Sequence, residues 1–164
     1  MREGHPDIRL IPSVVSGDPN DRRSIITAAS IPAKKLGIKT AQPVSMALRT
    51  CPKLLIVGGD WLWYKECSEG FIGICRSYSP VLQQFSIDEC FIDMTFRLYG
   101  KDPVQVATQL KDEIKNKLGF TVNVGVGSNK LLAKMASDFE KPDKVHTLWD
   151  SEVRERRTRI FRAW

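Results

Sequence analysis

The chain has 164 residues, of which 42% are hydrophobic and 27% are charged, a composition that supports one compact domain, or a domain with an inserted lobe. No stretch approaches the roughly 18 to 20 apolar residues of a membrane span, and the first residues lack a secretory signal, so we expect a cytoplasmic protein with no membrane partner. With 25 Lys and Arg against 19 Asp and Glu, the net charge is +6, which favours a polyanionic partner.

Short strands and short helices are predicted in the first third of the chain. Apolar runs separated by a Gly-Asp-Pro turn predict strands within 12–17 and 24–29. Capping and stop residues predict helices within 30–37, from Ser30 to Gly37, and within 43–51. The run LLIV at 54–57 predicts a buried strand.

The elements expected after these are, in order, a helix within 60–78, a hairpin within 81–95, a helix within 102–119, a strand at 121–127, a helix from Ser128 or Asn129, and a strand at 145–149. The first of these helices should bury one apolar face made of Trp63, Cys67, Phe71, Ile74 and Tyr78. From Pro80 onward the order indicates an α+β fold whose sheet has helices on one face and is open on the other.

Three carboxylates, Asp88, Glu89 and Asp93, interrupt the apolar sequence FSIDECFIDMT at 85–95. Two ionised carboxylates about 4 Å apart repel by roughly 4 kcal/mol at an effective dielectric near 20. The neighbouring pair Asp88 and Glu89 should therefore share a proton or hold a cation, and oxygen ligands suit Mg²⁺. The alternative is a solvated acidic turn, although Asp-Glu matches poorly the Asn-Gly or Asp-Gly preferred in tight turns.

A hairpin with Asp88-Glu89 as its two-residue turn would place both acids on the open face of the sheet. In that register the facing pairs are Ile87 with Cys90, Phe85 with Ile92, and Gln83 with Met94. The opposite, more polar face would carry Gln84, Ser86, Phe91 and Asp93. In the strand at 121–127, Gly125 and Gly127 would leave room for another backbone, or else mark a bulge or close helix packing.

The sequences FSIDECFIDMT and VNVGVGSNKLLAKMASDFEKPD resemble the Y-family translesion DNA polymerases, the DinB and UmuC group. Agreement continues upstream, so that the resemblance covers residues 6–148. It implies an α+β fold with a small fingers lobe at 1–52 and a palm at 53–149. The palm would be a ferredoxin-like (βαββαβ-type) antiparallel sheet lacking its first strand, and 150–164 would begin the thumb or form a non-native tail.

The function implied by the resemblance is template-directed nucleotidyl transfer past damaged DNA, within DNA repair and the SOS response, by a two-metal mechanism. Asp88 would be a ligand of two Mg²⁺ ions and Glu89 an accessory ligand, whereas Asp93 is interpreted as structural. The implied partners are primer-template DNA, a deoxynucleoside triphosphate, and a sliding clamp or other replication proteins reached through regions outside this chain.

The resemblance also implies nucleotide contacts away from the acids. Lys141 matches a lysine that contacts the triphosphate. Thr27, Ala28 and Lys34 match nucleotide-binding positions, and Thr40 and Ala41 match positions that line the nascent base pair. The family commonly has Tyr and Arg where this chain has Ile31 and Lys34, so the triphosphate would be held differently.

The family's first metal-binding Asp, and the aromatic residue that excludes ribonucleotides, belong to a motif that precedes the fingers. We expect this chain to lack both, and therefore to polymerise poorly or not at all by itself. The competing hypothesis is a non-catalytic module that binds nucleic acid or a polymerase subunit, because ferredoxin-like folds host many functions.

Overall fold

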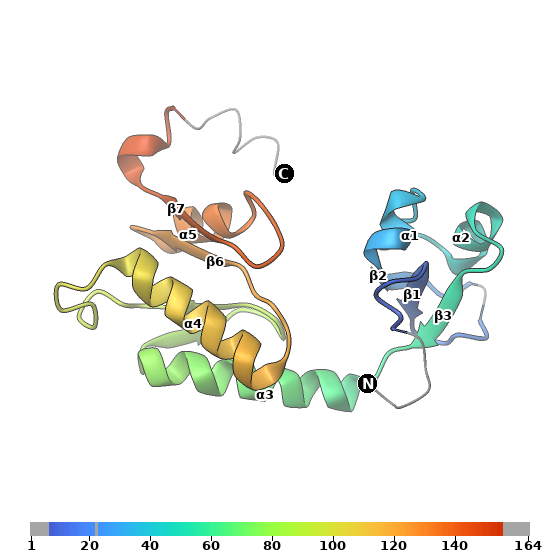
Figure 1. Cartoon of the computed structure of the whole chain (residues 1–164), viewed down its shortest axis with the longest axis horizontal. Helices are drawn as coiled ribbons and strands as arrows, with labels where there is room; N and C mark the ends of the chain where they lie inside the picture. The colour runs from blue at the N-terminus through green and yellow to red at the C-terminus, as the bar shows by residue number, and fades with distance from the viewer. Residues whose placement is uncertain (1–6, 22, 156–164) are drawn as a thin grey trace. The chain divides into compact units, whose positions relative to one another are not determined.

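The computed structural model describes residues 7–21 and 23–155. These described residues divide into two compact units, one that ends at Trp61 and one that begins at Leu62 (Figure 1). Most of the predicted thumb or tail, from residue 156 onward, lies outside the described residues. Among the helices that are described, none is long and apolar enough to cross a membrane.

The first unit is a small three-stranded sheet with two short helices. Its elements are β1 (Ser13–Ser16), β2 (Ile26–Ala29), α1 (Ile31–Lys35), α2 (Val44–Thr50) and β3 (Leu55–Gly58). The strand order is β2-β1-β3, with β1 antiparallel to β2 and parallel to β3. The expected boundary between fingers and palm after residue 52 stays a prediction. The strand β3, which follows this boundary, pairs with β1 and belongs to the first unit.

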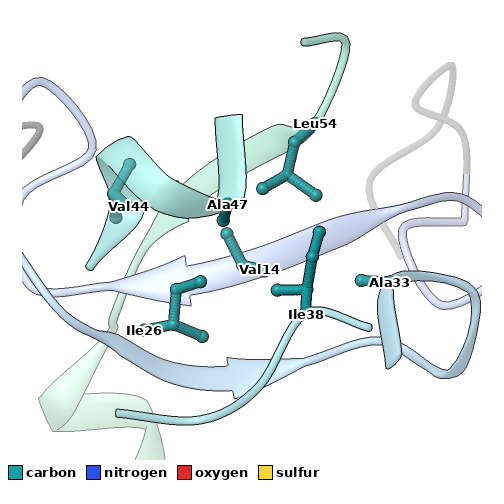
Figure 2. Close-up of a cluster of buried hydrophobic side chains, with 7 residues drawn as sticks. All are labelled: Val14, Ile26, Ala33, Ile38, Val44, Ala47 and Leu54. Carbon is teal, nitrogen blue, oxygen red and sulfur yellow. The ribbon is translucent and has the colours of Figure 1, made fainter. Parts of the chain in front are cut away.

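The core of this unit lies between the sheet and its helices. Figure 2 shows the buried side chains that form it: Val14, Ile26, Ala33, Ile38, Val44, Ala47 and Leu54. The expected burial of the strand at 54–57 is wrong for part of that run, because Leu55 is 37% exposed while Leu54 is buried. As the edge strand of a small sheet, β3 has less covering than a central strand would have.

Several helix ends occur where the sequence predicts them. The Ser30 hydroxyl accepts a hydrogen bond from the Ala33 amide at the start of α1. The Asp102 carboxylate does the same for the Val104 amide at the start of the fourth helix. That helix ends at Gly119, whose φ of 76° is the left-handed conformation that glycine adopts without strain.

The second unit combines helices with two separate pairs of strands. Its elements are α3 (Trp61–Tyr78), β4 (Leu82–Gln84), β5 (Cys90–Ile92), α4 (Pro103–Leu118), β6 (Val124–Gly127), α5 (Lys130–Ser137), β7 (Val145–Leu148) and the 3₁₀ helix η1 (Asp150–Glu152). The α+β class is confirmed. The single antiparallel sheet is not, because β4–β5 is antiparallel, β6–β7 is parallel, and no described strand joins them.

The buried face of α3 differs from the predicted one. Its buried residues are Ser68, Phe71, Ile72 and Cys75, which follow the i, i+3, i+4, i+7 spacing of one helix face. Trp63, expected in that face, is 59% exposed. The face packs against Leu110 and Ile114 of α4, so the position of α4 decides which side of α3 is covered.

The last helix, α5, lies directly on β6. A Cβ atom added at Gly125 would be 1.9 Å from the Ala133 carbonyl oxygen, and one at Gly127 would be 2.8 Å from the Ala133 nitrogen. The glycines therefore permit close helix packing. This was one of the interpretations left open by the sequence, beside a bulge and a space for another backbone. The glycine face of β6 is covered by α5, whereas Val122, on the opposite face by strand alternation, packs into the core of α3 and α4. Both α4 and α5 thus pack against β6–β7 (Figure 1), and the expected open face is wrong for these strands.

We predict that Gly125→Ala lowers the free energy of unfolding by about 2 to 3 kcal/mol, because the added methyl group cannot fit against the backbone of α5. Urea denaturation followed by circular dichroism measures the change. Gly73→Ala is the matched control, since nothing lies within 4 Å of its Cβ position in α3, and this variant should gain up to about 1 kcal/mol. Equal stability of the two variants would contradict the close packing.

Candidate functional site

The acidic pair Asp88 and Glu89 lies in the loop between β4 and β5, and this loop is wider than predicted. Gln84 faces Cys90, and Gln83 faces Phe91, so the expected register with Ile87 opposite Cys90 is wrong. The Glu89 carbonyl accepts hydrogen bonds from the amides of Phe85, at 2.9 Å, and Ser86, at 3.1 Å. The wider loop avoids the positive φ that a two-residue primed turn imposes on Asp-Glu.

The changed register moves β4 side chains to the other face of the hairpin. Leu82, Cys90 and Ile92 pack against the core formed by α3 and α4. Phe85, expected on this core face, is 65% exposed. Its ring lies edge-on against that of Phe91, with the centroids 5.8 Å apart. Phe91 was expected on the more polar face, and strand alternation from Cys90 and Ile92 puts it there.

The two carboxylates have different partners. Asp88 is exposed, and its Oδ1 accepts a hydrogen bond from the Ser86 hydroxyl at 2.7 Å. Glu89 is half-buried, and its Oε1 accepts a hydrogen bond from the Lys134 ammonium group of α5. Neither carboxylate is sealed in the core, so both remain available to a ligand from solution.

Alternating charges continue from Glu89 along α5. Lys134 Nζ also lies 3.6 Å from Asp138 Oδ2, and the other oxygen of Asp138 is 2.7 Å from Lys141 Nζ. The hydrogen bond to Glu89 and the charge of Asp138 raise the pKa of Lys134, although its partial burial opposes this. Burial disfavours the ionised form of Asp138, but the hydrogen bond from Lys141 and the two lysine charges outweigh it and lower the pKa.

Asp93, the third acid of the motif, stabilises the turn in which it lies. Its Oδ1 accepts hydrogen bonds from the Thr95 amide at 2.9 Å and the Thr95 hydroxyl at 2.6 Å, and these bonds lower the pKa of Asp93. The charge of Lys130 lowers it further. This arrangement agrees with the structural role inferred from the sequence.

The donor chemistry of the acidic loop fits Mg²⁺ in part. Asp88 and Glu89 supply hard oxygen atoms, but residues 7–21 and 23–155 contain no group of three or more His, Cys, Asp or Glu placed to hold a metal ion. Mg²⁺ usually keeps several water ligands and binds one or two carboxylates together with substrate phosphates. The pair can therefore form part of a coordination shell, provided that Glu89 exchanges Lys134 for the metal.

The nucleotide positions predicted near the N-terminus gather within the first unit. The Ala41 amide donates to the Ile26 carbonyl at 2.8 Å, which brings the loop carrying Thr40 and Ala41 beside the start of β2. Thr27 and Ala28 follow on that strand, and all of these predicted side chains are exposed. Lys34 is exposed on α1, whereas Lys141 belongs to the second unit.

Sequence reasoning missed Lys134 and Asp138. The available signal was their spacing on the predicted last helix, since Lys134 and Asp138 are an i, i+4 pair, and Asp138 and Lys141 are three residues apart. That spacing predicts an ion-paired helix surface. The contact from Lys134 to Glu89 spans 45 residues and depends on how the elements pack.

Asp143 anchors the segment that carries Lys141. Its carboxylate accepts hydrogen bonds from the ammonium groups of Lys111, at 2.9 Å, and Lys115, at 2.6 Å, both on α4. The hydrogen bond from Lys115, which has the larger effect, and the one from Lys111 both lower the pKa of Asp143. Because the Lys111 side chain is only 11% exposed, the pair ties the segment before β7 firmly to α4.

We predict that the stability lost in Asp143→Asn depends on pH. A carboxyl group whose pKa is lowered in the folded state stabilises the fold when the pH is above its ordinary pKa of 3.8. This stabilisation is lost as the pH falls through the folded-state pKa. The difference in unfolding free energy between wild type and variant should therefore be largest at neutral pH and shrink in acid. Asn tolerates the φ of 61° at this position. A difference that stays constant down to acid pH would exclude the ion pairs as its source.

Comparison with known proteins connects this geometry to a family. Residues 1–138 match the model of the impB/mucB/samB family. The DNA polymerase IV of Clostridium acetobutylicum is 43% identical over 150 residues, which cover 92% of this chain and 38% of that protein. The DNA polymerase IV of Clostridium kluyveri is 38% identical over 151 residues, with 91% and 38% covered.

Solved structures give the same result. DinB from Sulfolobus solfataricus has a TM-score of 0.82 at 29% identity and matches 90% of this chain and 44% of its own. An insertion ternary complex of Dbh DNA polymerase has a TM-score of 0.79 at 28% identity, with 88% and 43% covered. The chain spans less than half the length of each of these relatives. It belongs to the impB/mucB/samB family, and the predicted resemblance to DinB-like Y-family polymerases is confirmed.

Proposed function

We propose that this chain supplies the fingers (1–52) and the palm (53–149) of a translesion DNA polymerase, which extends a primer past damaged template bases. The observation that carries the proposal is the acidic loop, in which Asp88 is exposed and Glu89 is paired with a lysine. The similarity to proteins named DNA polymerase IV supports it. The proposed partners are primer-template DNA and a deoxynucleoside triphosphate, with clamp contacts made by other regions of a longer protein.

The separation of the two strand pairs is consistent with a palm. In a βαββαβ sheet the first strand lies between the third and fourth strands. Within the second unit β5 and β6 hold those positions, and among described residues each pairs on one side only. We propose that a strand of the longer protein joins them and carries the further metal-binding Asp.

The chemistry assigned to this chain's residues is binding and positioning. When bound, Mg²⁺ lowers the pKa of the primer 3′-hydroxyl and neutralises charge on the leaving pyrophosphate. Asp88 and Glu89 would hold it. Lys141 would contact the β- and γ-phosphates as a compact point charge, and it would leave Asp138 to do so.

The first unit would contact the nucleotide through exposed side chains. Thr27, Ala28 and Lys34 are proposed to bind the nucleotide, and the small residues Thr40 and Ala41 to line the nascent base pair. The hydroxyl of Thr27 donates to the Val15 carbonyl at 3.1 Å, so its methyl group is the part of the side chain that remains for contact with a base or sugar.

The competing function is a non-catalytic module that binds nucleic acid. The net charge of +6 supports both functions, because phosphate neutralisation is common to them. The acidic loop favours the polymerase, since two carboxylates at a phosphate-binding surface weaken binding unless a cation accompanies them.

We predict that Asp88→Ala abolishes primer extension by a chimera in which the matched residues of this chain replace those of the Clostridium acetobutylicum polymerase. The expected loss is at least about 100-fold, because metal stabilisation of transition-state charge contributes several kcal/mol. Template-dependent extension of a labelled primer measures it. Glu66→Gln, at an exposed acid on α3, is the matched control and should retain activity.

The same assay tests the chain alone, which should extend the primer poorly or not at all. Robust extension by the chain alone would refute the need for a further metal-binding Asp. A chimera that binds DNA but whose extension is unaffected by Asp88→Ala would favour the non-catalytic module.

We predict that DNA binding by the chain weakens linearly in the logarithm of affinity as the logarithm of salt concentration rises. The slope should be about −0.9 for each duplex phosphate contacted. Lys141→Ala should reduce the magnitude of this slope by about 1, which corresponds to the loss of one phosphate contact. Lys65→Ala, which removes an equal charge from α3, should leave it unchanged. Fluorescence anisotropy with a primer-template measures affinity, and affinity insensitive to salt would exclude phosphate neutralisation by lysine.

A further inference from the structure

Lys134 occupies the carboxylate that a metal ion would use. Its Nζ donates to Glu89 Oε1, and the two side chains are 29% and 38% exposed. The ammonium group projects from α5, and α5 is held against β6 by the contact at Gly125. A helix fixed in this way delivers the cation to Glu89 with little loss of side-chain freedom beyond that of Lys134 itself.

A second acceptor lies close to the same ammonium group. Asp138 Oδ2 is 3.6 Å from Lys134 Nζ, one helical turn further along. Lys134 can therefore move from Glu89 to Asp138 while remaining paired with a carboxylate. Because Lys134 itself stays paired with a carboxylate, this exchange costs far less than removal of the lysine from Glu89 without a replacement partner.

We propose that Lys134 is a resident counter-ion of Glu89, which a divalent cation displaces and which then pairs with Asp138. This inference rests on the proposed metal-binding role of the acidic loop. Asp138 also holds Lys141, through its other oxygen Oδ1, at 2.7 Å. A closer approach of Lys134 to Oδ2 shares the charge of one carboxylate between two ammonium groups that repel each other, which weakens the hold on Lys141. Metal binding thereby releases a lysine for a phosphate group, and the two binding events favour each other.

The counter-ion role has a consequence that a purely structural ion pair lacks. If Lys134 competes with the metal, removal of its charge must tighten divalent-cation binding. A charge-assisted, partly exposed pair of this kind corresponds to roughly a 3- to 10-fold change in affinity. A structural role alone would change the stability of the fold and leave metal affinity as it was, or weaken it.

The test titrates Mn²⁺, a spectroscopic probe for the Mg²⁺ site, into the chain and counts the free ion by electron paramagnetic resonance. Lys134→Met should bind Mn²⁺ roughly 3- to 10-fold more tightly than wild type. Lys134→Arg keeps the cation and should bind as wild type does. Lys130→Met is the matched control, because it removes the same charge from the preceding turn of α5, where the partner is the uncharged Gln83, and its effect should be smaller.

The double variant Glu89→Gln with Lys134→Met separates direct competition from a general electrostatic effect. In the Glu89→Gln background, Lys134→Met should change affinity no more than Lys130→Met does. The counter-ion role would be overturned if Lys134→Met raised Mn²⁺ affinity equally in the wild-type and Glu89→Gln backgrounds. It would also be overturned if Lys130→Met raised Mn²⁺ affinity as much as Lys134→Met does. Circular dichroism shows whether each variant folds, and Lys134→Gln, which also removes the charge but stays polar, replaces Lys134→Met if the Met variant unfolds.

The variant Asp88→Asn separates an incorrect counter-ion role from an incorrect metal site. If Asp88→Asn weakens Mn²⁺ binding but Lys134→Met does not tighten it, only the counter-ion role is wrong. If Asp88→Asn leaves binding unchanged, or if neither wild type nor Lys134→Met binds Mn²⁺, the metal site itself is wrong in this chain.

Discussion

The close contact between α5 and β6 is the constraint on which the candidate site depends. Gly125 and Gly127 bring the helix so near the strand that a methyl group at either position would collide with helix backbone or side-chain atoms. Since α5 carries Lys130 and Lys134, this contact also determines where the ammonium groups of these two lysines lie. Lys130 meets Gln83 on the hairpin, and Lys134 meets Glu89.

Electrostatic pairing extends from that contact across the site. Glu89, Lys134, Asp138 and Lys141 alternate in charge, and each is within ion-pair distance of the next. Glu89 and Lys141, which are proposed to bind the metal ion and the phosphate groups, are thus both ion-paired in the free chain, whereas Asp88 is hydrogen-bonded to Ser86. Ligands of opposite charge would break these pairs together, which suits a reaction whose substrate arrives as a complex of a metal ion with a triphosphate. The Asp143 anchor to α4 holds the backbone segment that carries Lys141.

The register of the β4–β5 hairpin shows why part of the site was predicted wrongly. Alternation placed Phe91 correctly because it depends only on counting from core residues such as Cys90 and Ile92. The position of Phe85 depended on the assumed turn, and the wider loop moved it to the face of Phe91. A local pattern defines alternation within one strand, whereas the offset between two strands depends on loop conformation and on the helices beneath them.

The amino-acid sequence by itself determined the family, the α+β class, the order of the elements and the helix starts at Ser30 and Asp102, because these depend on residues a few positions apart. It also located the acids in the loop before β5. Only the tertiary structure decided which face of α3 is buried, that α5 covers the glycines of β6, and that Lys134 pairs with Glu89. The physical reason is distance along the chain: such contacts join segments that propensity and capping cannot relate, and packing against a shared core selects them.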